Sequence, residues 1–227
     1  GEADVPLKLF PVYKNLCELR GVTDFAESDL FFPDLSLRAP KDPGATPVSE
    51  TEFPALAKAE RARYQRGLLK FLRDAEGNAG TPEMREALLA IERAQALPAQ
   101  RTFWWATGAL IESLGNKGLS SDAETKRLLG RIDQQIRKLA EPSSKVAERL
   151  LREVLYRVAC SRPVSERIKQ VKHAFDLDEC LPAAAPRGRG DDFSRLQPLL
   201  RELKELLAPV KEAWLKFTTG HEESSKN

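Results

Sequence analysis

Apolar residues recur along this chain at intervals of three and four positions, which is the repeat of one face of an α-helix. The pattern continues almost from end to end, and no Asn-Gly or Asp-Gly pair joins two alternating segments as in a β-hairpin. We therefore predict an all-α fold. Short connections between the helices favour antiparallel neighbours, as in an up-and-down bundle.

Residues 1–48 predict one helix followed by a proline-rich strap. The helix would end at Gly21, and one of its faces carries Leu9, Val12, Leu16 and Leu19. Beyond it, four prolines between positions 33 and 47 interrupt the helical repeat. We expect Phe31 and Phe32 to pack this strap against the bundle, because a free linker gains nothing from two phenylalanines. Whether the first helix belongs to the bundle stays open.

Residues 49–179 predict the helical bundle itself. Helix starts are marked by Ser-x-x-Glu capping boxes at Ser49 and Ser121, and by Thr81 before a proline. The inward-facing stripes of the first two bundle helices include Leu72 and Leu97. The expected helices cover residues 49–74, 81–97, 98–115, 121–141, 143–161 and 164–175.

The last part of the chain has a different pattern. Residues 180–192 predict a linker, residues 193–219 a helix with a period of 3.5, and residues 220–227 a frayed polar tail. Within the helix, Pro209 predicts a kink. A packing face on the bundle, the opening helix of a next module and a dimer contact all stay open for its seam. The seam consists of Leu196, Leu200, Leu203, Leu207, Val210, Trp214 and Phe217.

The balance of charge narrows the classes of function. The chain has 36 Lys and Arg residues against 34 Asp and Glu residues, a net charge of +2. This balance gives no general reason to bind nucleic acid or an anionic membrane. Apolar runs all fall short of about 20 residues, and the three cysteines are widely separated. We therefore expect a cytoplasmic protein without membrane insertion, metal site or cofactor, whose thiols stay reduced.

The most informative segment covers residues 101–108, R-T-F-W-W-A-T-G, on the third helix of the predicted bundle. The phosphorylated helix of a histidine phosphotransfer domain carries F-H-x-x-K-G. Aligned with that pattern, the segment keeps Phe103 and Gly108, but Trp104 replaces the histidine and Thr107 replaces the lysine. An indole nitrogen offers no lone pair, so tryptophan cannot accept a phosphoryl group as a neutral imidazole does.

These residues predict a degenerate phosphotransfer motif and a candidate interaction surface, with no catalytic residue. The set comprises Phe103, Trp104, Trp105, Thr107 and Gly108. Neighbouring residues on a helix point about 100° apart, so both tryptophans can be buried only where the helix is enclosed on a broad face. Two roles stay open for this set: contact with a partner protein, and packing in an ordinary bundle core.

The two histidines stand outside any phosphotransfer pattern. His173 has no lysine three residues later and no glycine four residues later, and His221 lies in the polar tail. A histidine near a helix C-terminus is usually a favourable contact with the helix dipole. We expect neither histidine to accept phosphate.

Basic residues are concentrated on the helix expected at 121–141. They are Lys126, Arg127, Arg131, Arg137 and Lys138. Asp133 and Glu141 are interleaved with them, and no aromatic pattern supports stacking on nucleic acid. We interpret this set as a solvated helix face.

Five segments together resemble the N-terminal region of the ChpA/PilL chemosensory kinases of the type IV pilus system. They are L-F-F-P-D-L-S (30–36), R-Y-Q-R-G-L-L (63–69), R-T-F-W-W (101–105), R-I-D-Q-Q-I-R-K-L (131–139) and V-A-E-R-L-L-R-E-V-L-Y (146–156). The resemblance covers roughly residues 7–175, and FimL regulators are similar more loosely. It implies a cytoplasmic bundle related to phosphotransfer domains, in a two-component chemosensory system that controls twitching motility.

The resemblance and the degenerate motif lead to one functional hypothesis. We expect a non-phosphorylatable interaction domain without enzyme activity of its own. The implied partners are neighbouring kinase modules, a response regulator or a pilus regulatory protein, and the oligomeric state stays open. Two alternatives remain: an active phosphotransfer protein with an unconventional acceptor, and a structural spacer between kinase modules.

Overall fold

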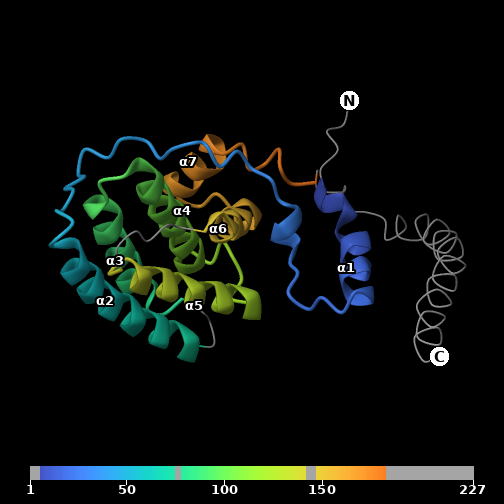
Figure 1. Cartoon of the computed structure of the whole chain (residues 1–227), viewed down its shortest axis with the longest axis horizontal. Coiled ribbons are helices and arrows are strands. Elements are labelled where there is room, and N and C mark those ends of the chain that lie inside the picture. Colours follow the sequence, from blue (N-terminus) through green and yellow to red (C-terminus); the bar gives the residue numbers. More distant parts are fainter. Residues whose placement is uncertain (1–5, 75–77, 142–146, 183–227) are drawn as a thin grey trace, which may run out of the picture. The chain divides into compact units, whose positions relative to one another are not determined.

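The computed structural model describes residues 6–74, 78–141 and 147–182. These residues contain seven α-helices and two short 3-10 helices without a strand, which confirms the all-α prediction (Figure 1). The 3-10 helices are η1 (Pro6–Leu9) and η2 (Glu27–Leu30). The α-helices are α1 (Phe10–Leu19), α2 (Phe53–Arg73), α3 (Thr81–Ala94), α4 (Pro98–Gly115), α5 (Ala123–Lys138), α6 (Glu148–Cys160) and α7 (Glu166–Ala174).

Helix α4 lies at the centre of the bundle. It packs against α3, α6 and α7, while α5 lies along α2 and contacts α6 (Figure 1). The α2–α3 hairpin is closed by two glycines: a Cβ at Gly67 would lie 2.5 Å from the carbonyl oxygen of Gly80. Gly80 also has a φ of 81°, a conformation that glycine adopts without strain. This close approach sets α3 between α2 and α4.

Local helix signals were correct to within a few residues in the bundle. Helix α4 spans the predicted range, since Pro98 starts it and Gly115 ends it. The capping box at Ser121 was wrong by one residue: Asp122 is the N-cap, and its carboxylate accepts a hydrogen bond from the Thr125 backbone N–H at 2.7 Å. The Ser49 hydroxyl donates to the Glu52 side chain instead of capping the backbone, and α2 begins only at Phe53.

The prediction that two leucines lie in the core was wrong. Leu72 and Leu97 are both exposed. Leu72 lies in the last turn of α2, whose buried residues are Ala57, Tyr64, Gly67 and Phe71. Leu97 follows the end of α3 at Ala94, so the helical repeat no longer sets its direction. Leu72 thus lies within α2 but outside its buried face, whereas Leu97 lies beyond the end of its predicted helix.

Helix α1 packs its aromatic side against Phe25 and leaves its leucine side exposed. Phe10 and Tyr13 pack with Phe25, with ring centroids 6.4–6.5 Å apart, and Cys17 is buried on the same side. The opposite stripe is exposed, comprising Leu9, Val12, Leu16 and Leu19. Amphipathic spacing alone does not distinguish these two faces, because both carry apolar side chains.

The strap after α1 is attached to the bundle at both ends. Phe31 is fully buried and packs edge-on against Tyr156 of α6, with ring centroids 5.4 Å apart. Phe32 is exposed, with the Arg152 guanidinium 5.2 Å from its ring centroid. Further along, the Ala39 backbone N–H donates to Thr102 Oγ1 on α4 at 2.9 Å. Of the two phenylalanines, only Phe31 enters the core.

The described residues form part of the first of two units, which divide after residue 182. The heptad seam from Leu196 to Phe217, the linker from 183 onward and the polar tail lie outside the described residues. The proposed boundaries between strap, bundle and linker therefore stay predictions. Within the described residues, no helix combines the length and apolar character that crossing a membrane requires.

Candidate functional site

The degenerate motif lies on the most enclosed helix of the bundle. Trp104 is 0% exposed and Trp105 is 4% exposed. Phe103, Thr107 and Gly108 are buried as well. Helix α4 is apolar around nearly its whole circumference, which is the pattern of a helix surrounded by others. The structure thus encloses the broad face that burial of both tryptophans requires.

Local contacts fix the aromatic residues of α4 in the core. The Phe103 and Trp104 rings pack edge to face with centroids 4.7 Å apart, and Trp105 lies against Phe175 at 6.4 Å. The Thr107 hydroxyl donates to the Phe103 carbonyl oxygen at 2.8 Å, one turn earlier on the same helix. The position that would carry the phosphotransfer lysine is therefore occupied by a small hydroxyl whose hydrogen bond stays within the helix.

Gly108 leaves space for an arginine of the same chain. The Arg167 guanidinium of α7 crosses the helix there, and a Cβ at Gly108 would lie 2.5 Å from Arg167 Nη1. Arg167 Nη1 donates to Glu92 Oε2 of α3 at 2.7 Å, and Arg167 Nε lies 3.6 Å from Glu112 Oε1 of α4. In an active phosphotransfer domain a glycine at this position admits the partner's active site. In this chain, the space above Gly108 is filled by Arg167 of the same chain.

The charges around Arg167 are held in a mostly buried network. Glu92 is 3% exposed, and burial raises the pKa of its carboxyl group although the Arg167 charge opposes that rise. Glu112 also accepts a hydrogen bond from the Ser165 hydroxyl at 2.7 Å. Ser165 in turn caps α7 by accepting from the Ile168 backbone N–H. The network therefore ties α7 across α3 and α4 at the motif.

Burial decides between the two roles left open for the motif. An interaction surface needs exposed atoms, and its two tryptophans expose almost none. Trp104 and Trp105 are therefore core residues, and the interaction-surface interpretation does not fit Phe103, Thr107 or Gly108 either. No sequence pattern indicates Arg167, and the only sign of Glu92 is its position four residues after Leu88 on the buried stripe of α3.

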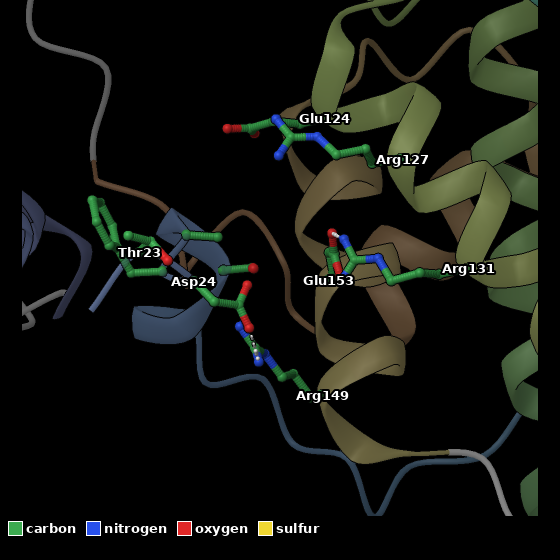
Figure 2. Close-up of a pocket in the computed structure, with 10 residues that line it drawn as sticks. Thr23, Asp24, Glu124, Arg127, Arg131, Arg149 and Glu153 are labelled. Atoms are coloured by element: carbon green, nitrogen blue, oxygen red, sulfur yellow. Dashed lines mark hydrogen bonds and ion pairs between the residues drawn. The ribbon is translucent and has the colours of Figure 1, made fainter. Parts of the chain in front are cut away.

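A cleft of about 540 Å³ opens elsewhere, between residues 23–28 and helices α5 and α6. Figure 2 shows Arg127 and Arg131 projecting from α5 on one side and Arg149 from α6 below them. Its remaining labelled lining residues are Thr23, Asp24, Glu124 and Glu153.

Most charges in the cleft neutralise one another. Arg149 Nη1 donates to Asp24 at 3.0 Å, which ties residues 23–28 to α6. Arg131 donates to Glu153, whose pKa is raised by burial despite this partner. Arg127 forms no ion pair with a described carboxylate. The ion pairs in the cleft therefore mainly join the strap to the bundle. Arg127, at the edge of the cleft, is left without a carboxylate partner among the described residues.

Residues typical of catalytic or metal sites do not assemble in the part of the chain that the structure describes. No three His, Cys, Asp or Glu side chains there gather closely enough to hold a metal ion. His173 is exposed near the C-terminus of α7 and stands apart from the Arg167 network, while His221 lies outside the described residues. Both remain without an assigned chemical role.

Comparison with known proteins gives one assignment. Neither the curated proteins nor the solved structures contain a significant match to the chain. The family described as FimL scaffold protein second domain matches residues 49–187, which include α2 to α7. The match names FimL proteins and gives no support to the ChpA/PilL kinases in particular. Because it covers more than half of the 227 residues, the chain belongs to the FimL scaffold protein second-domain family.

Proposed function

We propose that this chain is a non-phosphorylatable scaffold domain, derived from a phosphotransfer-type bundle, that acts in the chemosensory control of type IV pili and twitching motility. The family assignment supports the scaffold role, because a scaffold works by binding other proteins. The resemblance to ChpA/PilL kinases supports the chemosensory setting. The proposed partners are protein components of that system, such as a response regulator or a pilus regulatory protein.

One observation carries the proposed loss of phosphotransfer. The helix that aligns with the phosphorylated helix has tryptophan at the acceptor position, fully buried, and Arg167 occupies the space above Gly108. A phosphoacceptor must present a nucleophile to the aspartyl phosphate of a partner. Helix α4 presents neither a nucleophile nor an open approach. A domain of this kind contributes binding and positioning to a signalling complex.

Phosphorylation of the purified chain tests this loss directly. The chain is incubated with acetyl phosphate and, separately, with a phosphorylated receiver domain, and an active histidine phosphotransfer domain serves as the positive control. We expect no acid-labile phosphate on the chain by intact-mass measurement and Phos-tag electrophoresis. Stable phosphohistidine at His173 or His221 that disappears on His→Gln substitution would favour the active-phosphotransfer alternative.

The pilus role is tested in the bacterium that encodes the chain. Deleting the coding region should reduce twitching zones and surface pili, and expression of the wild-type chain should restore both. A Trp104→Ala variant controls for loss of fold, because it removes core packing without touching the surface. Normal twitching and piliation after deletion would contradict the proposed function, whatever the chain binds in solution.

A further inference from the structure

The exposed face of α5 is basic, and the two acidic residues within this helix pair with neighbouring helices. The basic face comprises Lys126, Arg127, Arg131, Arg137 and Lys138, of which only Lys126 is partly buried. At 100° per residue these five positions fall within an arc of about 140°. Two neutral residues, Gly130 and Gln134, complete the middle of the arc.

The two acidic residues of α5 lie at the edges of this arc, and each forms an ion pair with an arginine of a neighbouring helix. Asp133 faces α2, where Arg61 Nε and Nη2 donate to its two oxygens at 3.0 and 2.8 Å. Glu124 lies at the other edge and pairs with Arg157 of α6. Neither carboxylate is therefore available to neutralise the basic face. Of the two acids that interleave with these cations in the sequence, Asp133 is thus turned away, whereas Glu141 lies beyond the end of α5 at Lys138 and is exposed.

Most cations on the basic face form no ion pair with a described carboxylate. Arg131 pairs with Glu153 in the cleft (Figure 2). Lys126, Arg127, Arg137 and Lys138 form no ion pair with a described carboxylate, and the only hydrogen bond of Arg127 there goes to the Ala123 carbonyl oxygen at 3.4 Å. The face thus concentrates positive charge on a chain whose net charge is only +2.

Gly130 gives an independent sign of contact at the middle of this face. Glycine in a helix interior lowers stability relative to alanine, so it usually answers a packing need. At Gly67 and Gly108 a Cβ would come within 2.5 Å of other atoms of the chain, but at Gly130 it would meet nothing within 4 Å. The chain's own packing does not require this glycine. It leaves the α5 backbone open to close approach from outside.

We propose that the basic face of α5 binds an acidic segment of a protein partner, with its closest approach at Gly130. This inference rests on the proposed scaffold role and specifies the surface and the chemistry of one partner. The cations from Lys126 to Lys138 span about 18 Å of helix, which matches an extended segment of about five residues. Its Asp and Glu side chains would pair with Arg127, Arg137 and Lys138.

Other polyanions fit this surface less well. A membrane-binding helix inserts its apolar face, but Leu128, Ile132 and Ile136 of α5 are in the core. Single-stranded nucleic acid binds where aromatic side chains stack between cations, and the arc has none. A short acidic protein segment avoids these conflicts.

The test measures binding of the full chain to a fluorescent 20-residue peptide of alternating Glu and Ala by anisotropy at low salt. The face variant carries Arg127→Gln, Arg137→Gln and Lys138→Gln. The matched control carries Lys58→Gln, Arg162→Gln and Lys169→Gln, three exposed cations elsewhere. We expect at least about tenfold weaker binding in the face variant and less than about twofold change in the control. Equal losses in both variants would overturn the proposal.

Gly130→Leu separates close contact from long-range attraction, because it changes no charge and fills the open space above α5. We expect this folded variant to bind the peptide at least about fivefold more weakly, while Gly130→Ala lies between it and the wild type. Unchanged affinity in Gly130→Leu would overturn the proposed contact. No binding of the peptide to the wild type at millimolar concentration would do the same.

Two further probes distinguish the polyanions. A 20-nucleotide single-stranded DNA and vesicles with 30% phosphatidylserine are titrated against the same variants. If the face variant loses DNA or vesicle binding more than peptide binding, the face belongs to that class of ligand and the proposal fails. The outcome is separable from the proposed function: normal twitching after deletion contradicts the pilus role even where peptide binding depends on α5.

Discussion

Helices α4 and α5 carry the two features of this sequence that suggest function. The bundle buries the feature on α4 and exposes the one on α5. Helix α4 carries the segment that resembles a phosphotransfer motif, but its residues face inward and Arg167 fills the space above Gly108. Helix α5 has an ordinary charged pattern, but its acids turn to neighbouring helices and its cations stay outside. A binding surface is therefore better sought on α5 than on α4.

The same contrast appears in two glycines that look alike in sequence. Gly108 is filled by the chain's own arginine, whereas Gly130 faces open space. A glycine that the fold uses should resist substitution, and a glycine that the fold does not use should tolerate it. Substitutions in these two helices therefore test whether the surface is closed at α4 and open at α5.

The largest effect is expected for Trp104→Ala. The side chain is fully buried against Phe103, so its removal leaves a large cavity and should lower the free energy of unfolding by about 3–5 kcal/mol. Guanidinium denaturation followed by far-UV circular dichroism measures the change. Lys169→Ala on the exposed side of α7 is the control and should stay within about 0.5 kcal/mol. A comparably small cost for Trp104→Ala would mean that α4 is not enclosed.

Gly108→Ala should have the next largest effect. The added methyl group displaces the Arg167 guanidinium from Glu92, and we expect the free energy of unfolding to fall by about 1–3 kcal/mol. In an Arg167→Ala background the same substitution should cost at least about 0.5 kcal/mol less, because the clash is gone. A double-mutant cycle from denaturation curves gives this coupling. Additive costs would show that Arg167 does not occupy the space above Gly108.

Gly130→Ala should shift stability in the opposite direction. The substitution meets no atom within 4 Å and reduces the freedom of the unfolded chain, so the free energy of unfolding should rise by about 0.5–1 kcal/mol. The melting temperature and the denaturation midpoint both report this gain. Gly67→Ala is a matched comparison, because there a Cβ would lie 2.5 Å from a backbone oxygen and the substitution should destabilise. A loss at Gly130 would indicate an internal packing role.

The smallest effect on stability is expected for the α5 face variant with Arg127→Gln, Arg137→Gln and Lys138→Gln. These side chains are exposed and pair with no described carboxylate, so each substitution should change the free energy of unfolding by less than about 0.5 kcal/mol. Denaturation of this variant beside the wild type makes the check. A large loss would show that the basic face supports the fold, and its binding results would then need a stable replacement set.

Much of the bundle could be predicted from sequence because its signals are local. Pro98 and Gly115 fixed α4, and the inward stripe Leu128, Ile132 and Ile136 fixed the buried side of α5. The first helix was less determinate, since apolar residues occupy both of its faces and only Phe25 shows which one packs. Helix ends were the weakest point, because the repeat at Leu72 and Leu97 continues past the residues that a neighbour covers.

The candidate sites show the same division between local sequence signals and contacts made across the fold. Residue identity alone shows that α4 contains no histidine and that Trp104 offers no imidazole nitrogen. The fold was needed to show that Arg167 fills the space at Gly108 and that Arg61 pairs with Asp133. Those partners stand 59 and 72 positions away along the chain, beyond the reach of any helical repeat. Packing therefore determines which charges pair inside the bundle and which stay on its surface.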